Sequence, residues 1–189
     1  MSSHHIIREK QEPAILIMSF DGFSSENLGQ LLEWSPTVII DHAIYEEADS
    51  YGIKIDVVIA ADTEFAVQAN TKIVLSEGDE LEDGLKYLTG EGYPAVNVIT
   101  DKFALKDYAL FVDLIDLVIY TSGKKIYPVK SGFSKWLSVA EDIEIYNEAI
   151  NLHMSGLTKV SDKLYRTVKD GFFVITFDQD FIFISENIL

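Results

Sequence analysis

Between Ala14 and about Ile115, short apolar runs rich in valine and isoleucine alternate with segments of helical periodicity. The apolar runs are AILIMSF, TVIID, DVVIA, KIVLS and AVNVIT, and the helix-like segments are SSENLGQLLEW, AIYEEADSYG, ELEDGLKYLTGEG and LKDYALFVDLI. Continuous β-branched runs separated by amphipathic helices are typical of a parallel sheet with both faces covered. The pattern therefore predicts an N-terminal three-layer α/β domain, in which IVL of KIVLS is also a buried strand.

Helix ends are signalled at the expected places. Ser24 or Ser25 can cap the first helix, and Gly52 follows EEADSY as a residue that ends a helix. Gly90 and Gly92 stop the segment ELEDGLKYLT. These signals support the helix positions given by the periodicity.

After Ile115 the pattern changes to short strands with turn signals. DLVIYTSGKKIYPV, KWLSVAEDIEIYN and YRTVKDGFFVITFDQDFIFIS are predicted hairpins, which together favour an antiparallel sandwich or open barrel. We therefore predict two domains, an α/β domain at 1–113 and an antiparallel β domain at 114–189. The segment FIFIS is apolar on both faces, so it suits either a core strand or a strand buried in a dimer.

Composition narrows the classes of function. The chain has 189 residues, is 48% hydrophobic and carries a net charge of −16, which opposes binding to nucleic acid or to an anionic membrane. There is no cysteine, so disulfides, thiolate zinc sites and a cysteine nucleophile are excluded. No apolar run approaches about 18 residues, and we expect a cytoplasmic protein. His4 and His5 are predicted to belong to a disordered tail instead of a metal site.

Acidic residues follow the ends of the predicted strands: Asp21, Asp41, Asp62, the run from Asp79 to Asp83, and Asp101. Ligands of parallel α/β sheets bind beyond the carboxyl ends of the strands, near the point where strand order reverses. Oxygen ligands without cysteine suit Mg²⁺, which proteins hold through one or two carboxylates and substrate phosphates. Aspartate also caps helices routinely, and acids in a first helical turn complement the helix dipole, so a purely structural role is the alternative.

Several common sites are absent from the sequence. There is no G-x-x-x-x-G-K-[ST] and no G-x-G-x-x-G, and TSGKKIYP lies in a predicted hairpin instead of a strand-to-helix loop. His42 and His153 are not in a context typical of a catalytic triad. The carboxylates are thus the strongest candidates for chemistry.

The order of these pieces resembles the thiamine pyrophosphokinase family. TVIIDHAIYEEADSYGIKIDVVIAAD is similar to the family's A-D-G-G-A strand, short helix and G-D-x-D-S segment, and GDELEDGLKYLTGEGYPAVNVI to its D-Q-x-x-T-D-F-x-K-A-L segment and next strand. INLHMSGL and DGFFVIT resemble the thiamine-binding β domain more weakly. The resemblance covers most of the chain, and it implies an α/β catalytic domain followed by a β domain, with thiamine bound at a dimer interface.

Residue by residue, the resemblance assigns catalytic positions to Asp41, Asp83 and Lys86. Beside these, we predict binding roles for Asp62, Asp79 and Asp107, with Mg²⁺ held by Asp41, Asp62 and Asp83. The chain departs from the pattern at AADTE, where Ala61 and Thr63 replace the family's two metal-binding aspartates and Asp62 lies between them. Further departures are His42 and Ala43 for the glycines, Asp79 for the glutamine, a missing arginine near Asp107, and a shortened serine–asparagine loop before KLYRTV.

The resemblance implies transfer of pyrophosphate from ATP to thiamine, giving thiamine diphosphate and AMP, in a Mg²⁺-dependent homodimer. The alternative is an impaired or inactive homologue that binds a nucleotide or a thiamine-like heterocycle, or a purely structural dimer. Loss of electrophilic groups in phosphoryl transfer costs on the order of a thousandfold in rate. A nucleic-acid-binding module is disfavoured by the acidic charge.

Overall fold

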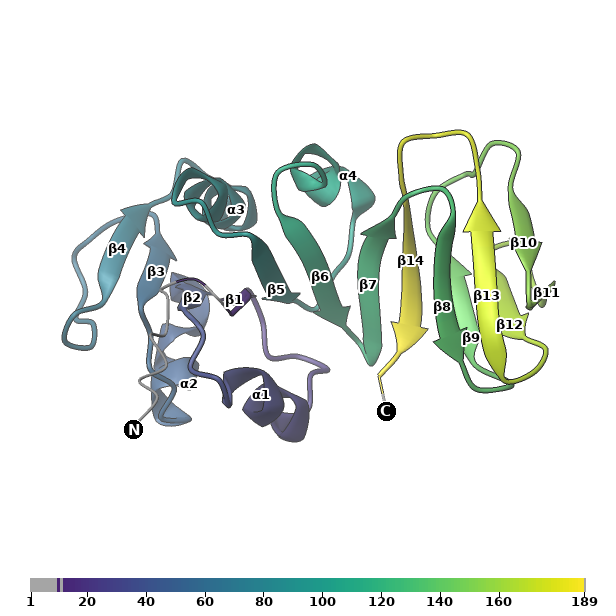
Figure 1. Ribbon diagram of the computed structural model, residues 1–189. Coiled ribbons are helices and arrows are strands. Elements are labelled where there is room, and N and C mark those ends of the chain that lie inside the picture. Colours follow the sequence, from purple (N-terminus) through teal and green to yellow (C-terminus); the bar gives the residue numbers. More distant parts are fainter. Residues whose placement is uncertain (1–9, 11, 189) are drawn as a thin grey trace, which may run out of the picture.

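A computed structural model describes residue 10 and residues 12–188 (Figure 1). His4 and His5 lie outside the described residues, so the prediction made for them is not tested. In the N-terminal half, six parallel strands are arranged in the order β4-β3-β2-β1-β5-β6. They are β1 (Ala14–Ile17), β2 (Val38–Asp41), β3 (Val57–Ala60), β4 (Lys72–Leu75), β5 (Ala95–Ile99) and β6 (Asp116–Thr121). Strand order reverses at β1 and β5, so this is the switch point of the sheet.

Helices cover both faces of the parallel strands, as predicted (Figure 1). On one face lie α1 (Ser25–Leu32), the 3₁₀ turn η1 (His42–Ile44) and α2 (Tyr45–Ser50). On the other lie α3 (Glu80–Gly90), α4 (Leu105–Tyr108) and the 3₁₀ turn η2 (Ala109–Phe111). The segment LKDYALFVDLI therefore forms only a short helix and a turn.

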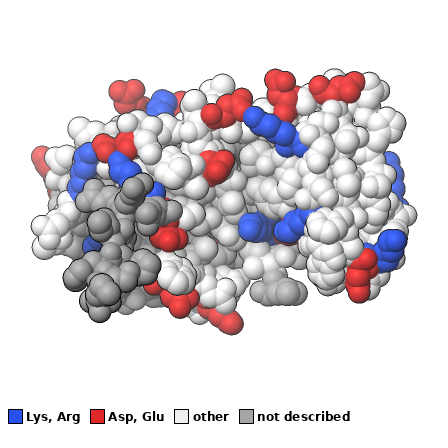
Figure 2. Space-filling model, viewed as in Figure 1, with Lys and Arg blue, Asp and Glu red and all other residues white. Residues whose placement is uncertain are grey.

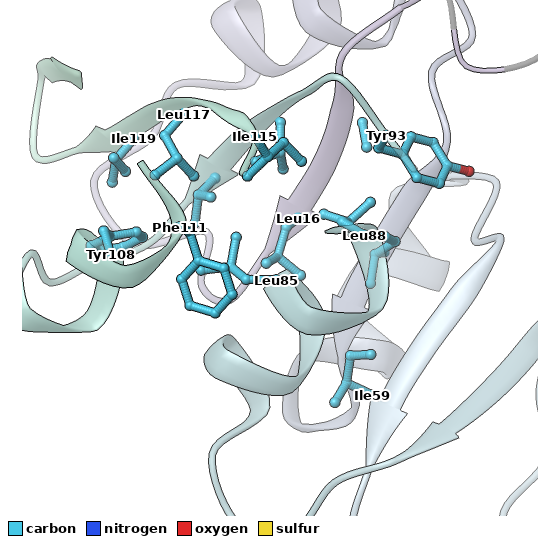
Figure 3. Packing of buried hydrophobic residues seen from close by; sticks show 14 of the residues in the cluster. Leu16, Ile59, Leu85, Leu88, Tyr93, Tyr108, Phe111, Ile115, Leu117 and Ile119 are labelled. Carbon is cyan, nitrogen blue, oxygen red and sulfur yellow. The ribbon is translucent and has the colours of Figure 1, made fainter. Parts of the chain in front are cut away.

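Strand β1 shows why the sheet has two covered faces. Its four residues are fully buried, with Leu16 packing in the α3 and α4 layer and Ile15 and Ile17 in the α1 and α2 layer. In the first of these layers, Leu85 and Leu88 of α3 pack against the sheet (Figure 3). A side chain at Gly84 would place its Cβ 3.0 Å from Leu16 Cδ1, so α3 lies close against β1.

Strand β4 differs from the sequence prediction. We expected IVL of KIVLS to be buried, but β4 is the edge strand, its residues are exposed or half-buried, and the Leu75 side chain is 59% exposed. An edge strand pairs on one side only, and apolarity of a short run does not indicate how many neighbours a strand has.

The sheet continues without interruption into the antiparallel half. Strand β6 pairs parallel with β5 and antiparallel with β7, and the remaining order is β7-β14-β9-β12-β11. These strands are β7 (Lys124–Val129), β9 (Asp142–Ile145), β11 (Leu157–Lys159), β12 (Leu164–Thr167) and β14 (Ile182–Asn187). The proposed boundary between 113 and 114 falls just before β6, and the division into two domains stays a prediction.

A second, antiparallel sheet has the order β10-β13-β8 and packs on this half. Its strands are β8 (Phe133–Leu137), β10 (His153–Ser155) and β13 (Gly171–Thr176). Phe173 and Ile175 of β13 share a buried cluster with Ile143 of β9 and Ile184 of β14. The two-sheet packing is that of a sandwich, which is one of the two forms expected for this half.

Only one of the three predicted hairpin segments is correct. DLVIYTSGKKIYPV forms the hairpin β6–β7, whose turn residues Ser122 and Gly123 both have positive φ. KWLSVAEDIEIYN and YRTVKDGFFVITFDQDFIFIS do not form hairpins, because successive strands there alternate between the two sheets. The turn signals mark where strands end, but they do not indicate which sheet the next strand joins.

The helix signals agree with the structure. Ser24 caps α1 and its Oγ accepts a hydrogen bond from the Asn27 N–H at 3.1 Å. Gly52 and Gly92 have φ of +71° and +76° at the ends of α2 and α3, respectively, while Gly90 still lies in the helix. FIFIS contributes to β14, which is buried between β7 and β9 within the chain's own sheet. Within the described residues, no helix is long and apolar enough to span a membrane.

Candidate functional site

Asp83 fixes the loop that joins β4 to α3. Its Oδ2 accepts a hydrogen bond from Ser76 Oγ at 3.0 Å and one from the Glu77 N–H at 2.8 Å, and its side chain is only 12% exposed. Ser76 Oγ also accepts the Gly78 N–H at 3.0 Å. One oxygen of the Asp83 carboxylate is therefore already occupied by two donors of its own loop.

Asp79 and Lys86 make polar contacts within the first two turns of α3. Asp79 is the N-cap, and its Oδ1 accepts the Glu82 N–H at 2.9 Å, so this residue has the structural role considered for the first-turn acids. Lys86 Nζ lies 2.9 Å from Glu82 Oε1 and 3.8 Å from Asp83 Oδ1. The hydrogen bond to Glu82 raises the pKa of Lys86, so the ammonium stays charged at neutral pH.

Asp41 lies at the carboxyl end of β2, on the same sheet edge. Its Oδ1 accepts the Ala43 N–H at 2.9 Å and caps η1. Burial raises the pKa of Asp41, the negative charge of Glu80 raises it further, and the Ala43 N–H and His42 oppose both effects. Asp41 is therefore close enough to α3 for the negative charge of Glu80 to affect its pKa.

Asp62 and Asp107 occupy different surroundings. Asp62 follows β3, is exposed, and accepts the Glu64 N–H at 3.0 Å within its own loop. Asp107 lies in α4 and lines a small cavity of about 90 Å³ together with Asp79, Glu82 and Lys106. The structure thus brings Asp79 and Asp107, two of the predicted binding residues, to one cavity.

The predicted metal ligands do not form a metal site in this arrangement. Among the described residues, no group of three aspartate, glutamate, histidine or cysteine side chains is placed to hold a metal ion, and this includes Asp41, Asp62 and Asp83. The Asp83 oxygen that faces the loop is also used by two donors. The residues as arranged do not fit a Mg²⁺ ion shared by these three carboxylates.

Two residues of the site were missed by the sequence reasoning, and a third was noted only as a member of the acidic run from Asp79 to Asp83. Ser76 holds Asp83 and Lys106 from α4 lines the cavity of Asp79, while Glu80, in that run, acts on Asp41. Ser76 follows its strand directly and could have been recognised as a loop hydroxyl near an acidic helix start. The positions of Glu80 and Lys106 depend on how α3 and α4 pack, which no local pattern records.

Comparison with solved structures identifies the fold. No protein-family model matches the chain, and no curated protein matches it in sequence. A probable thiamine pyrophosphokinase from Staphylococcus saprophyticus superposes with a TM-score of 0.66 at 11% identity, over 94% of this chain and 99% of that chain. Thiamine pyrophosphokinase from Bacillus subtilis gives 0.63 at 11% identity, over 93% and 99%. Thiamin pyrophosphokinase from Geobacillus thermodenitrificans gives 0.66 at 8% identity, over 92% and 97%.

These likenesses show that the chain has the fold of these thiamine pyrophosphokinases along nearly its whole length. At such low identity the likeness concerns the fold alone. The order of parallel and antiparallel strands agrees with the architecture that the sequence resemblance implies. Ligand binding by the individual side chains stays a prediction.

Proposed function

We propose that the chain is a thiamine pyrophosphokinase-like protein that transfers pyrophosphate from ATP to thiamine, giving thiamine diphosphate and AMP. The observation that carries this proposal is the fold, which matches solved thiamine pyrophosphokinases over 92–94% of the chain. The positions of Asp41, Asp83 and Lys86 near the carboxyl edge of the parallel strands are compatible with it.

In this reaction the thiamine hydroxyl attacks the β-phosphorus of ATP, the bond from that phosphorus to the α-phosphate oxygen breaks, and AMP leaves. Positioning and charge neutralisation carry most of such a transfer. Lys86 is one of the cations of this edge, and binding of a phosphate oxygen would compete with its ion pair to Glu82. Mg²⁺ is expected to enter with ATP, held largely by phosphates and water, and would neutralise charge on the phosphates.

The expected transfer rate is low. Ala61 and Thr63 supply no carboxylate where the family has its two metal-binding aspartates, and Asp62 between them is exposed. Loss of such electrostatic groups costs roughly a thousandfold in rate. We therefore expect turnover about a thousandfold below that of an enzyme with the complete aspartate set.

A homologue that binds the ligands without transferring pyrophosphate is the second candidate. The observation in its favour is that the described residues form no three-ligand metal group. The hydrogen bonds of Asp83 to its own loop point the same way, since they give this acid a structural task. Binding and turnover therefore have to be measured separately.

The test measures both quantities on the full chain. AMP formation from ATP is followed with and without thiamine, and thiamine and ATP binding are measured by calorimetry. Lys86→Gln should weaken ATP binding and thiamine-dependent AMP release, while Lys159→Gln, the same charge change on β11, should alter neither. Thiamine binding without AMP release would support the binding homologue, and absence of both would overturn the two candidates together.

A homodimer formed through the β domain is part of the proposal. On the outer face of the smaller sheet, Trp136 of β8 lies directly opposite Phe172 of β13, and these side chains are 52% and 69% exposed. Exposed aromatic pairs of this kind are common in interfaces. Light scattering at micromolar concentration should give twice the chain mass of 21.3 kDa, and Phe172→Ser should shift it toward the monomer.

A further inference from the structure

A groove lies on the large sheet between the two layers that cover this face, and Phe133 and Lys135 of β8 form part of its wall. The α1 and α2 layer covers β1, β2 and β3, and the smaller sheet covers β7, β9 and β14. Between them, the face of β6 and β7 borders a cavity of about 510 Å³ whose lining includes Val118, Tyr127, Phe133 and Phe181. None of the residues considered for pyrophosphate transfer lines this cavity.

The groove is basic in a strongly acidic protein. Three of the lining residues are Lys125, Lys130 and Lys135, whereas the only acid of the lining is Asp116. Figure 2 shows basic side chains gathered in the hollow at the middle of this face, over β7 and β8. In a chain with a net charge of −16, lysines gathered in a concave site favour the binding of a small anion there.

One wall of the groove is held rigidly by a largely buried carboxylate. Glu186 is 13% exposed, receives Lys135 Nζ at 2.7 Å and 2.5 Å on its two oxygens, and accepts a hydrogen bond from the Tyr127 hydroxyl. Burial and this carboxylate raise the pKa of Tyr127, so its phenol remains a neutral donor. The aromatic ring of Tyr127 is therefore fixed as a surface of the cavity.

Among the lysines that line the groove, Lys125 is the one whose ammonium remains available to bind a ligand. It is the cross-strand neighbour of Glu186, but that carboxylate is already bound by Lys135 and Tyr127. Lys124 pairs with Glu144 and Lys130 with Asp113, whereas among the described residues no carboxylate forms an ion pair with Lys125. Lys125 Nζ lies 5.9 Å from the centroid of the Tyr127 ring.

The same lysine also borders the neighbouring hollow. A second cavity, of about 650 Å³, has a lining that includes Phe23, Asn27, Gln30 and the acid Glu26 on the α1 side and Tyr120 and Lys125 on the sheet. Lys125 is therefore placed where the two hollows meet, with an apolar and aromatic wall on one side and polar side chains on the other. An ammonium with aromatic walls next to it suits a ligand that carries both an acid group and a ring.

We propose that this groove, defined by Lys125, Tyr127, Phe133 and Lys135, binds a small aromatic or heteroaromatic molecule that carries one anionic group. The acid group, a phosphate, sulfonate or carboxylate, accepts a hydrogen bond from Lys125, and the ring packs on Tyr127 and Phe133. The site is separate from the α3 edge, and its occupancy does not depend on pyrophosphate transfer.

The test uses two fluorescent probes that share their rings. 8-Anilinonaphthalene-1-sulfonate carries an anionic group, and N-phenyl-1-naphthylamine lacks it. We expect the sulfonate to bind the folded chain with one saturable site and more tightly than the neutral probe. Lys125→Gln should weaken sulfonate binding at least about fivefold, as expected for loss of one charge-assisted hydrogen bond. Its affinity for the neutral probe should change less than about twofold.

Two further variants act as controls. Lys125→Arg keeps the cation and should retain most of the sulfonate affinity, and Lys159→Gln, which makes the same charge change on the distant strand β11, should bind like the wild type. Equal affinity for the two probes, or equal loss in Lys125→Gln and Lys159→Gln, would overturn the proposal. So would unchanged sulfonate binding in Lys125→Gln, because the probe would then occupy another surface such as the exposed pair Trp136 and Phe172.

Discussion

Replacement of Asp83 by asparagine tests whether this acid holds the β4–α3 loop. The substitution keeps the shape of the side chain and removes its charge. Asp83 Oδ2 accepts two hydrogen bonds, from Ser76 Oγ at 3.0 Å and from the Glu77 N–H at 2.8 Å, and the side chain is 12% exposed. An asparagine oxygen can accept the same two bonds only as neutral ones.

The size of the effect follows from these two bonds. Hydrogen bonds to a charged group contribute about 1.5–3 kcal/mol each, and neutral ones are roughly half as strong, so Asp83→Asn should lower the free energy of unfolding by about 1.5–3 kcal/mol. Glu82→Gln is the matched control, since it removes the same charge from the same helical turn. Glu82 is 44% exposed and its pairing with Lys86 is an ordinary surface contact, so its loss costs less than about 1 kcal/mol.

Urea denaturation of both variants provides the assay, with melting temperature as a second readout. The two variants should differ by about 0.5–3 kcal/mol in the free energy of unfolding, which corresponds to roughly 1–12 °C in melting temperature for a domain of this size. Millimolar Mg²⁺ should shift the melting temperatures of wild type and Asp83→Asn equally, because the described residues form no three-ligand group. Equal stabilities of Asp83→Asn and Glu82→Gln would refute the loop role, and loss of the Mg²⁺ shift only in Asp83→Asn would restore this residue as a metal ligand.

Three other changes give independent tests. Gly156→Ala should destabilise the chain by at least about 1 kcal/mol more than Gly123→Ala, as measured by urea denaturation. Both glycines have φ of +77°, but only at Gly156 would the added Cβ meet a backbone oxygen, at 2.9 Å, and equal losses would count against this reason. Because burial raises the pKa of Asp41, the contribution of this acid to stability is greatest while it is protonated and falls as pH rises through its folded pKa. Asp41→Asn should remove that fall and be at least as stable as the wild type near pH 7, and a clear loss of stability there would contradict this. The Arg166 hydrogen bond lowers the pKa of Asp142, so Arg166→Gln should lower stability slightly above about pH 4 and by progressively less as pH falls. Denaturation at several pH values would show this.

Much of the α/β half could be predicted from the sequence because its signals are local. The five apolar runs form β1 to β5, and the helix caps at Ser24 and the glycine after α2 lie where propensity places them. The edge position of β4 could not be predicted, because burial depends on the number of neighbouring strands. The two incorrect hairpins have a similar cause, since a turn signal does not distinguish a hairpin from a crossing between two packed sheets.

The candidate site was predictable as a set of positions but not as an arrangement. The sequence places Asp41 at the end of a strand and Asp62 and Asp79 beyond strand ends, and the structure has them at those positions along the chain. The hydrogen bonds that occupy Asp83 and the meeting of Asp79 with Asp107 depend on the packing of α3 and α4. Whether a carboxylate is free or hydrogen-bonded by its own loop depends on the folded structure, so it cannot be predicted from residue type and spacing.

Thiamine-dependent release of AMP from ATP by the purified full chain tests the proposed function most directly. The proposal predicts AMP and thiamine diphosphate in equal amounts, at a rate about a thousandfold below that of an enzyme with all its aspartates, and a further loss in Lys86→Gln but not in Lys159→Gln. AMP formation that is independent of thiamine, or no AMP and no thiamine binding at millimolar concentration, would contradict it.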